Sequence, residues 1–197
     1  MPKKRLKKNR GASTNKLRII GGEWRSRKLP FVDAPGLRPT PDRIRETLFN
    51  WLQGQVHGAV CLDLFAGSGA LGLEALSRGA KDVVFVEKNT AVAKQISANL
   101  SLLKSAAGVI NVEADVFLSG LGKEGLFDLI FLDPPYRKGL LETSLNMIRE
   151  GNILKKDGLI YLEHESEEAF DWSCFNLEIL KEAKAGQVCC YLLTQIN

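Results

Sequence analysis

The chain contains 197 residues, of which 45% are hydrophobic and 25% are charged, a balance typical of one soluble globular domain with a small appendage. No stretch approaches the roughly 18 consecutive apolar residues of a membrane span, and the basic N-terminus lacks the apolar region of a secretory signal. Residues 1–47 hold 14 Lys and Arg against 4 Asp and Glu, a net charge of +10, whereas the remainder carries −6, so the basic front predicts a polyanionic partner.

The basic front begins with a tail, residues 1–16, that is rich in Lys and Arg and almost free of apolar side chains. Such a segment cannot bury enough surface to fold alone, so we expect it to be disordered when free. Residues 17–57 are interpreted as an N-terminal extension made of a hairpin and a helix. Residues 58–197 are interpreted as the main domain.

The extension opens with a predicted hairpin, in which residues 17–20 and 23–29 flank Gly21-Gly22. Arg25 and Arg27 fall on one face of its second arm, so this small basic ribbon is suited to lie along RNA. The alternative is an edge strand that is charged only to prevent aggregation. The arginines expected to contact RNA are Arg18, Arg25, Arg27, Arg43 and Arg45.

A helix is predicted after the hairpin, with Thr40 as its N-cap and Pro41 at its first position. Its apolar residues recur at helical spacing, which indicates a core-facing stripe and says nothing of function. Arg38 and Thr40 come just before this helix, where they could reach a ligand.

From residue 59 onward, short apolar runs alternate with helical patterns, which predicts a doubly wound α/β domain of Rossmann-like type. The sheet is expected to be mostly parallel, with one antiparallel strand near the C-terminus and the small β-hairpin as an N-terminal addition. The predicted strands are residues 59–64, 82–86, 109–112, 127–132, 158–163, 177–180 and 188–193. Three helices are predicted in this domain. The first begins near residue 70, and the other two span residues 91–103 and 140–148.

The first predicted strand of the main sheet runs into a glycine-rich turn that contains Gly67 and Gly69. Glycines allow a tight turn and the close approach of a ligand to the backbone. Glu87 follows the second strand, where an acidic residue usually grips a ribose diol. The same pattern fits a nicotinamide dehydrogenase, but Asp63 before the glycines would repel a pyrophosphate and would instead attract an ammonium group.

The fourth predicted strand ends in Asp133-Pro134-Pro135-Tyr136. The prolines lack N–H groups and stop the strand ladder, so a rigid corner presents a carboxylate and bare carbonyl oxygens at the ligand-binding edge of the sheet. The amine of guanine or adenine is a poor nucleophile, and two acceptors that hold both of its hydrogens can direct its lone pair. The ring of Tyr136 offers a surface on which a flipped base can stack.

These residues, taken in chain order, resemble the S-adenosylmethionine-dependent amino-methyltransferases. The motifs are Asp63-x-Phe65-x-Gly67-x-Gly69, Glu87, Asp115 and Asp133-Pro134-Pro135-Tyr136. The front of the chain narrows the resemblance to the RsmD-type family of bacterial small-subunit rRNA guanine-N2 methyltransferases. Its motifs are Leu17-Arg18-Ile19-Ile20-Gly21-Gly22, Arg38-Pro39-Thr40-Pro41-Asp42-Arg43-Ile44-Arg45-Glu46 and Leu48-Phe49-Asn50.

The resemblance implies a role for each motif. The glycine turn would pass under S-adenosylmethionine, Glu87 would accept from the ribose hydroxyls, and Asp115 would accept from the adenine amine. Asp133 and Pro134 would hold the guanine amine while Tyr136 stacks on the base, and these three form the predicted catalytic set. The residues expected to bind the cofactor are Arg38, Thr40, Asp63, Phe65, Ala66, Gly67, Gly69, Glu87, Lys88, Asp115, Val116 and Asp133.

The predicted partner is small-subunit rRNA, either free or within an assembling ribosomal particle, and the protein is expected to be a monomer. No membrane and no metal are expected, and four cysteines without metal spacing favour reduced thiols in the cytoplasm. The acidic run from Glu163 to Glu168 is interpreted as a solvated surface. Two alternatives remain: a DNA or RNA adenine-N6 methyltransferase, and a catalytically silent RNA-binding module.

Overall fold

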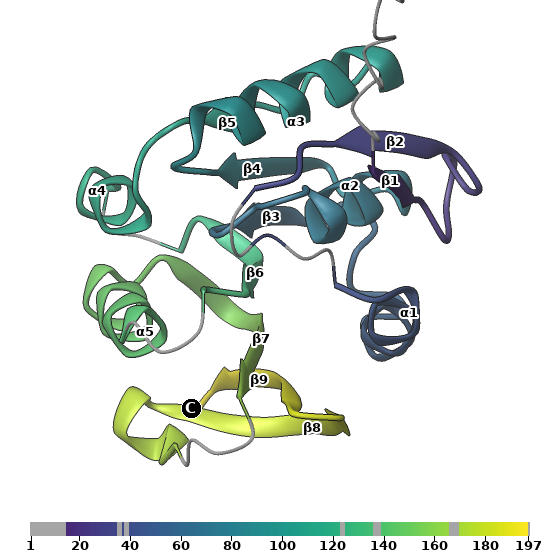
Figure 1. Cartoon of the computed structure of the whole chain (residues 1–197). Coiled ribbons are helices and arrows are strands. Elements are labelled where there is room, and N and C mark those ends of the chain that lie inside the picture. The colour runs from purple at the N-terminus through teal and green to yellow at the C-terminus, as the bar shows by residue number, and fades with distance from the viewer. Residues whose placement is uncertain are drawn as a thin grey trace, which may run out of the picture.

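The computed structural model describes residues 15–34, 37, 40–122, 125–135, 139–165 and 170–196. Its centre is a seven-stranded sheet in the order β5-β4-β3-β6-β7-β9-β8 (Figure 1). The strands of this sheet are β3 (Val60–Asp63), β4 (Asp82–Val86), β5 (Val109–Ile110), β6 (Phe127–Leu132), β7 (Leu154–Glu165), β8 (Leu177–Ala185) and β9 (Val188–Gln195).

Strands β3 to β7 run parallel, whereas β9 is antiparallel to both of its neighbours, β7 and β8. The chain builds outward from β3 through β4 to β5, then returns to place β6 on the other side of β3. This reversal makes a topological switch point between β3 and β6, where open α/β sheets bind ligands. The predicted fold class is therefore confirmed.

Helices cover both faces of the sheet, because alternate residues of the buried strands enter two separate cores. One core includes α1 (Asp42–Trp51), α2 (Ala70–Ser77) and α3 (Thr90–Leu103). The other includes α4 (Ala114–Ser119), α5 (Leu140–Gly151) and the 3₁₀ turn η1 (Trp172–Phe175) (Figure 1). No helix of the described residues is both long and apolar enough to cross a membrane.

The N-terminal hairpin exists, but its second arm lies later in the chain than expected. Strand β1 (Asn15–Arg18) pairs with β2 (Lys28–Phe31), and the residues between them form turns. The predicted alternation along residues 23–29 is therefore wrong. The physical reason is that residues 23–26 form a turn in which Ser26 adopts a positive φ angle of 70°, outside the extended conformation of a regular strand.

Other element boundaries differ at strand ends. Strand β5 has two residues where four were expected, and the unpredicted α4 places Asp115 in the first turn of a helix. Helix α1 begins at Asp42 without a side-chain cap, so the prediction that Thr40 caps it is wrong. Thr40 is instead buried, and its hydroxyl forms a hydrogen bond at Asp133.

Candidate active site

The glycine turn joins β3 to α2 at the switch point. Gly67 and Gly69 have φ angles of +51° and +76°, and Gly69 is the N-cap residue of α2. The turn is fixed from within by a hydrogen bond from Gly69 N to Ala66 O of 2.7 Å and from outside by one from Ala66 N to Val86 O of 3.0 Å. Phe65 is half-buried beside it. The result is a turn whose backbone a ligand can approach closely.

Gly72 and Asp63 lock α2 against the sheet. A Cβ at Gly72 would lie 2.3 Å from the Phe85 ring, so only glycine lets the helix sit this close. Gly72 N donates to Asp63 Oδ2 at 3.0 Å. Burial, with the nearby Glu87 charge adding to it, raises the pKa of Asp63 to about 7, although the Gly72 hydrogen bond lowers it. Asp63 is thus a buried carboxyl at the base of the turn, and its role towards a cofactor remains a prediction.

Glu87 connects the second strand to the glycine turn. Its Oε2 accepts from Gly67 N at 2.9 Å and its Oε1 accepts from Asn89 N at 2.7 Å. Asn111, which the sequence reasoning missed, donates to the carbonyl oxygens of Glu87 and Lys88 at 2.7 and 3.0 Å. The predicted strand at residues 109–112 enclosed Asn111, and only the end of β5 at Ile110 places it just past the strand. Glu87 is held beside the turn, and the exposed Lys88 follows it; the contact of Glu87 with a ribose remains a prediction.

Asp115 and Val116 are exposed in the first turn of α4. Asp115 Oδ1 accepts from Val116 N at 2.8 Å. The structure therefore presents a carboxylate and an amide side by side at the edge of the sheet that also holds Glu87. Their contact with adenine remains a prediction.

The Asp133-Pro134-Pro135 corner follows β6, with Asp133 half-buried and Pro134 buried. Leu132 is the last residue of β6 that pairs with β7, opposite Leu162, so Asp133 and Glu163 directly follow a registered pair on the two neighbouring strands. Burial, with Glu163 and Asp63 nearby, raises the pKa of Asp133, and hydrogen bonding from the Thr40 hydroxyl opposes this shift. The predicted Tyr136 and Arg38 lie outside the described residues.

Glu163 corrects the prediction of a solvated acidic surface, because its residue is 3% exposed. Tyr161, on the same face of β7, donates its hydroxyl to Glu163 Oε1 at 2.8 Å. Burial raises the pKa of Glu163, while hydrogen bonds from Tyr161 and Thr40 lower it. The sequence reasoning missed this residue, and the pairing of β6 with β7 was the signal that would have found it.

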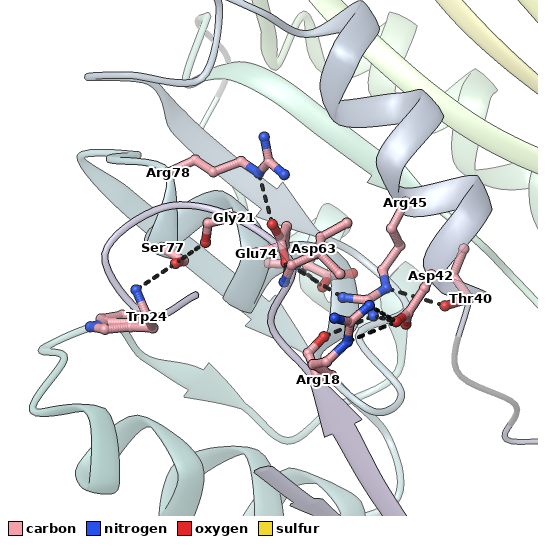
Figure 2. A network of polar contacts seen from close by, with 12 residues as sticks. Arg18, Gly21, Trp24, Thr40, Asp42, Arg45, Asp63, Glu74, Ser77 and Arg78 are labelled. Atoms are coloured by element: carbon pink, nitrogen blue, oxygen red, sulfur yellow. Dashed lines mark hydrogen bonds and ion pairs between the residues drawn. The ribbon is translucent and has the colours of Figure 1, made fainter. Parts of the chain in front are cut away.

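Arg45 corrects a second prediction, that of RNA contact, because its side chain is 0% exposed. It donates to the carbonyl oxygens of Thr40 and Arg18 and forms ion pairs with Asp42 and Glu74 (Figure 2). A fully buried guanidinium, four of whose N–H groups are bonded inside the protein, cannot reach a phosphate of RNA. Its position on the apolar face of α1 was the missed signal.

The other predicted RNA-contacting arginines lie at the surface. Arg25, Arg27 and Arg43 are exposed, and Arg18 is exposed while paired with Asp42 at 2.8 Å. Within the part of the chain that the structure describes, no group of three or more His, Cys, Asp or Glu side chains is arranged to hold a metal ion.

Known proteins resemble this chain over most of its length. A family model described as Conserved hypothetical protein 95 matches residues 17–194. Ribosomal RNA small subunit methyltransferase D of Escherichia coli (strain K12) is 47% identical over 184 residues, 93% of this chain and 92% of that protein. The protein of the same name from Haemophilus influenzae is 47% identical over 175 residues, 87% of this chain and 90% of that protein.

A solved structure is also similar to this chain. An Escherichia coli protein that is provisionally described as a methyltransferase has a TM-score of 0.82 and 47% identity, and the match covers 92% of this chain and 98% of that one. The matched region includes the extension, the glycine turn and the Asp133 corner. The chain therefore belongs to the RsmD family of methyltransferases, whose model carries the description Conserved hypothetical protein 95.

Proposed function

We propose that this protein transfers a methyl group from S-adenosylmethionine to the exocyclic N2 amine of a guanine in small-subunit rRNA. The observation that carries the proposal is the rigid carboxylate–proline corner at the carboxyl end of β6, beside the glycine turn at the end of β3. The names of the relatives from Escherichia coli and Haemophilus influenzae support ribosomal RNA as the substrate.

The residues at the switch point fit S-adenosylmethionine chemically. Gly67 and Gly69 leave the turn open to close approach, Glu87 offers a carboxylate to a ribose diol, and Asp115 offers an acceptor to the adenine amine. Bound there, the cofactor would supply an electrophilic methyl group on a sulfonium that leaves as a neutral thioether. A neutral leaving group needs no metal ion to stabilise it.

The protein would act mainly through alignment. The Asp133 carboxylate and the Pro134 carbonyl accept the two amine hydrogens and direct the nitrogen lone pair along the line of transfer. Proximity and orientation of this kind can contribute about 7–11 kcal/mol of barrier reduction. The proton of the methylated amine is lost at the same corner.

Asp133→Ala is expected to reduce the rate of methyl transfer by about 10²–10³ and to leave the affinity for S-adenosylmethionine within a few-fold of wild type. The reason is that Asp133 acts on the amine of the target base. Rate measurements on rRNA, with calorimetry of cofactor binding, check both parts. Activity within two-fold of wild type would remove Asp133 from the mechanism.

The exposed Arg18, Arg25, Arg27 and Arg43 would form the RNA-binding face of the extension, residues 17–57, ahead of a methyltransferase domain at residues 58–197. A monomer in the cytoplasm, acting on free rRNA or on an assembling ribosomal particle, completes the proposal. Arg43 lies on α1, and Thr40, just before that helix, hydrogen-bonds at Asp133 and Glu163, which supports a substrate that contacts both regions.

The decisive experiment uses small-subunit rRNA from a strain that lacks the gene for this protein. The purified protein and S-adenosylmethionine are added, and the modified nucleoside is identified by mass spectrometry. N2-methylguanosine at one position is expected. N6-methyladenosine would establish the adenine alternative, and RNA binding without methylation, at saturating cofactor, would establish the binding-module alternative.

A further inference from the structure

Two carboxyl groups come from neighbouring strands at the centre of the site, one just after β6 and the other within β7. Asp133 follows β6 and Glu163 lies at the matching position of β7, on parallel strands whose backbones lie about 4.8 Å apart. Like charges this close raise each other's proton affinity, so the pair resists double ionisation. The two members differ in exposure, because Glu163 is 3% exposed whereas Asp133 is half-buried and faces the ligand edge.

The surroundings of the pair favour charge on Glu163. The hydroxyl of Tyr161 donates to Glu163 Oε1 at 2.8 Å, and the Thr40 hydroxyl lies within hydrogen-bonding reach of both carboxyls, although its single proton is donated to one of them at a time. The other ionisable groups facing the pair are Asp63 from β3 and Cys190 from β9. Thr40 itself is held by Arg45, whose Nε donates to Thr40 O at 3.2 Å.

We propose that Glu163 is a positioning residue for methyl transfer, whose buried charge raises the proton affinity of Asp133, the carboxylate that takes the proton of the methylated amine. This inference rests on the proposed function. As the nitrogen gains its methyl group, one N–H bond breaks, and the proton passes to the Asp133 carboxylate, which becomes a neutral acid and later loses the proton to water.

A catalytic base takes up a proton most effectively when its pKa suits the pH at which the enzyme works. An isolated aspartate has a pKa of about 3.9 and is a weak base at neutral pH, whereas a catalytic base works best when its pKa lies near the working pH. Burial and the Glu163 charge raise the pKa of Asp133 in this direction. Glu163 needs no contact with substrate to do this.

The test compares the pH profile of kcat in wild type and in Glu163→Gln, with Glu178→Gln, an exposed site on β8, as the matched control. Removing the neighbouring charge lowers the pKa of Asp133, so the acid limb of Glu163→Gln should move to lower pH by about one unit or more, a tenfold change in proton affinity. Its maximal rate should fall, because the base is weaker. Glu178→Gln should keep the wild-type profile.

Thr40 provides a second variant with the opposite sign. Its hydroxyl lowers the pKa of both carboxyls, so Thr40→Val should move the acid limb to higher pH, and Thr40→Ser should restore it. An acid limb that stays in place in both Glu163→Gln and Thr40→Val would overturn the inference.

A carbon NMR titration of the Asp133 carboxyl, without RNA, keeps the inference separate from the proposed function. A midpoint well above the ordinary aspartate range in wild type, and lower in Glu163→Gln, is expected. An ordinary midpoint in wild type would overturn the role of Glu163 even if rRNA is methylated. An absence of rRNA methylation by wild type would overturn the proposed function, while the titration would still decide whether Glu163 sets the proton affinity of Asp133.

Discussion

Glu87 is a residue with two tasks, because its carboxylate accepts from Gly67 N and Asn89 N and is also expected to bind ribose. Glu87→Ala should raise the Kd of S-adenosylmethionine by roughly 10-fold or more, since charge-assisted hydrogen bonds contribute about 1.5–3 kcal/mol. Calorimetry measures the change. Glu113→Ala, at an exposed site before α4, is the control, and an unchanged Kd in Glu87→Ala would refute the ribose assignment.

Gly72 shows how one missing methyl group sets the spacing between a helix and a sheet. Alanine would gain about 1 kcal/mol of helix propensity. Its Cβ, however, would lie 2.3 Å from the fully buried Phe85 ring and 3.0 Å from Asp63 Oδ2. Overpacking a tight core commonly costs about 1–3 kcal/mol, and here the displaced atoms include a ring that has no free space.

Gly72→Ala should therefore lower the free energy of unfolding by about 1 kcal/mol or more, as measured by urea denaturation. Gly108→Ala is the matched control, because no atom lies within 4 Å of a Cβ at that position. Equal stability of the two variants would mean that α2 moves away from the sheet at little cost.

At the scale of elements, α1 and the hairpin are joined to α2 by buried charges. Arg45 and Glu74 are both fully buried, and Glu74 also accepts from Ile20 N at 2.9 Å and from Arg78 Nε at 2.7 Å (Figure 2). Removing one partner of such a network leaves a buried charge with less compensation, which commonly costs about 3–5 kcal/mol.

Arg45→Met should lower the free energy of unfolding by about 3 kcal/mol, at the lower end of that range because Glu74 keeps Arg78. The same substitution at the exposed Arg43, on the same helix, should change stability by less than about 0.5 kcal/mol. Thermal and urea denaturation of the two variants provide the comparison. A loss below 1 kcal/mol in Arg45→Met would show that the network adds little to stability.

At the scale of the whole molecule, charge is divided between a basic front and an acidic body. Replacing Arg25 and Arg27 together with Ala should weaken RNA binding and leave cofactor binding unchanged. Each lost phosphate contact should reduce the salt slope of log K by about 0.7–0.9. Removing residues 1–14, the part of the predicted tail that precedes β1, is expected to have a smaller effect at physiological salt, because a segment that is disordered when free would lose entropy on binding.

The control for this pair is the double variant Lys94→Ala and Lys156→Ala, two exposed lysines outside the front. Titrations of RNA between low and physiological salt separate a specific face from general charge. If the double Arg variant keeps the wild-type slope and affinity, the hairpin is only a charged edge and RNA binds elsewhere.

Local sequence patterns predicted most of this architecture, because short apolar runs indicate the strands and helical spacing of apolar residues indicates the helices between them. The turn at Gly67, the carboxylate of Glu87 and the corner at Asp133 were likewise visible, since turn chemistry is local. The errors at the site concern side chains whose surroundings come from distant segments, whereas those in the fold concern the second hairpin arm, the length of β5, the unpredicted α4 and the cap of α1. Arg45 and Glu163 are charged in sequence, and only the approach of α2 and the pairing of β6 with β7 bury them.

The bond from Ile20 N to Glu74 Oε2 spans 54 positions of the chain. The chain is synthesised at about 5–20 residues per second, and the basic front is made first. The loop around Ile20 can therefore bind Glu74 only after α2 has been synthesised. Until then its cationic hairpin stays unanchored next to the ribosome that is making it. Nascent chains that end before Glu74 should leave Ile20 open to proteolysis, and chains that extend beyond β4 should protect it.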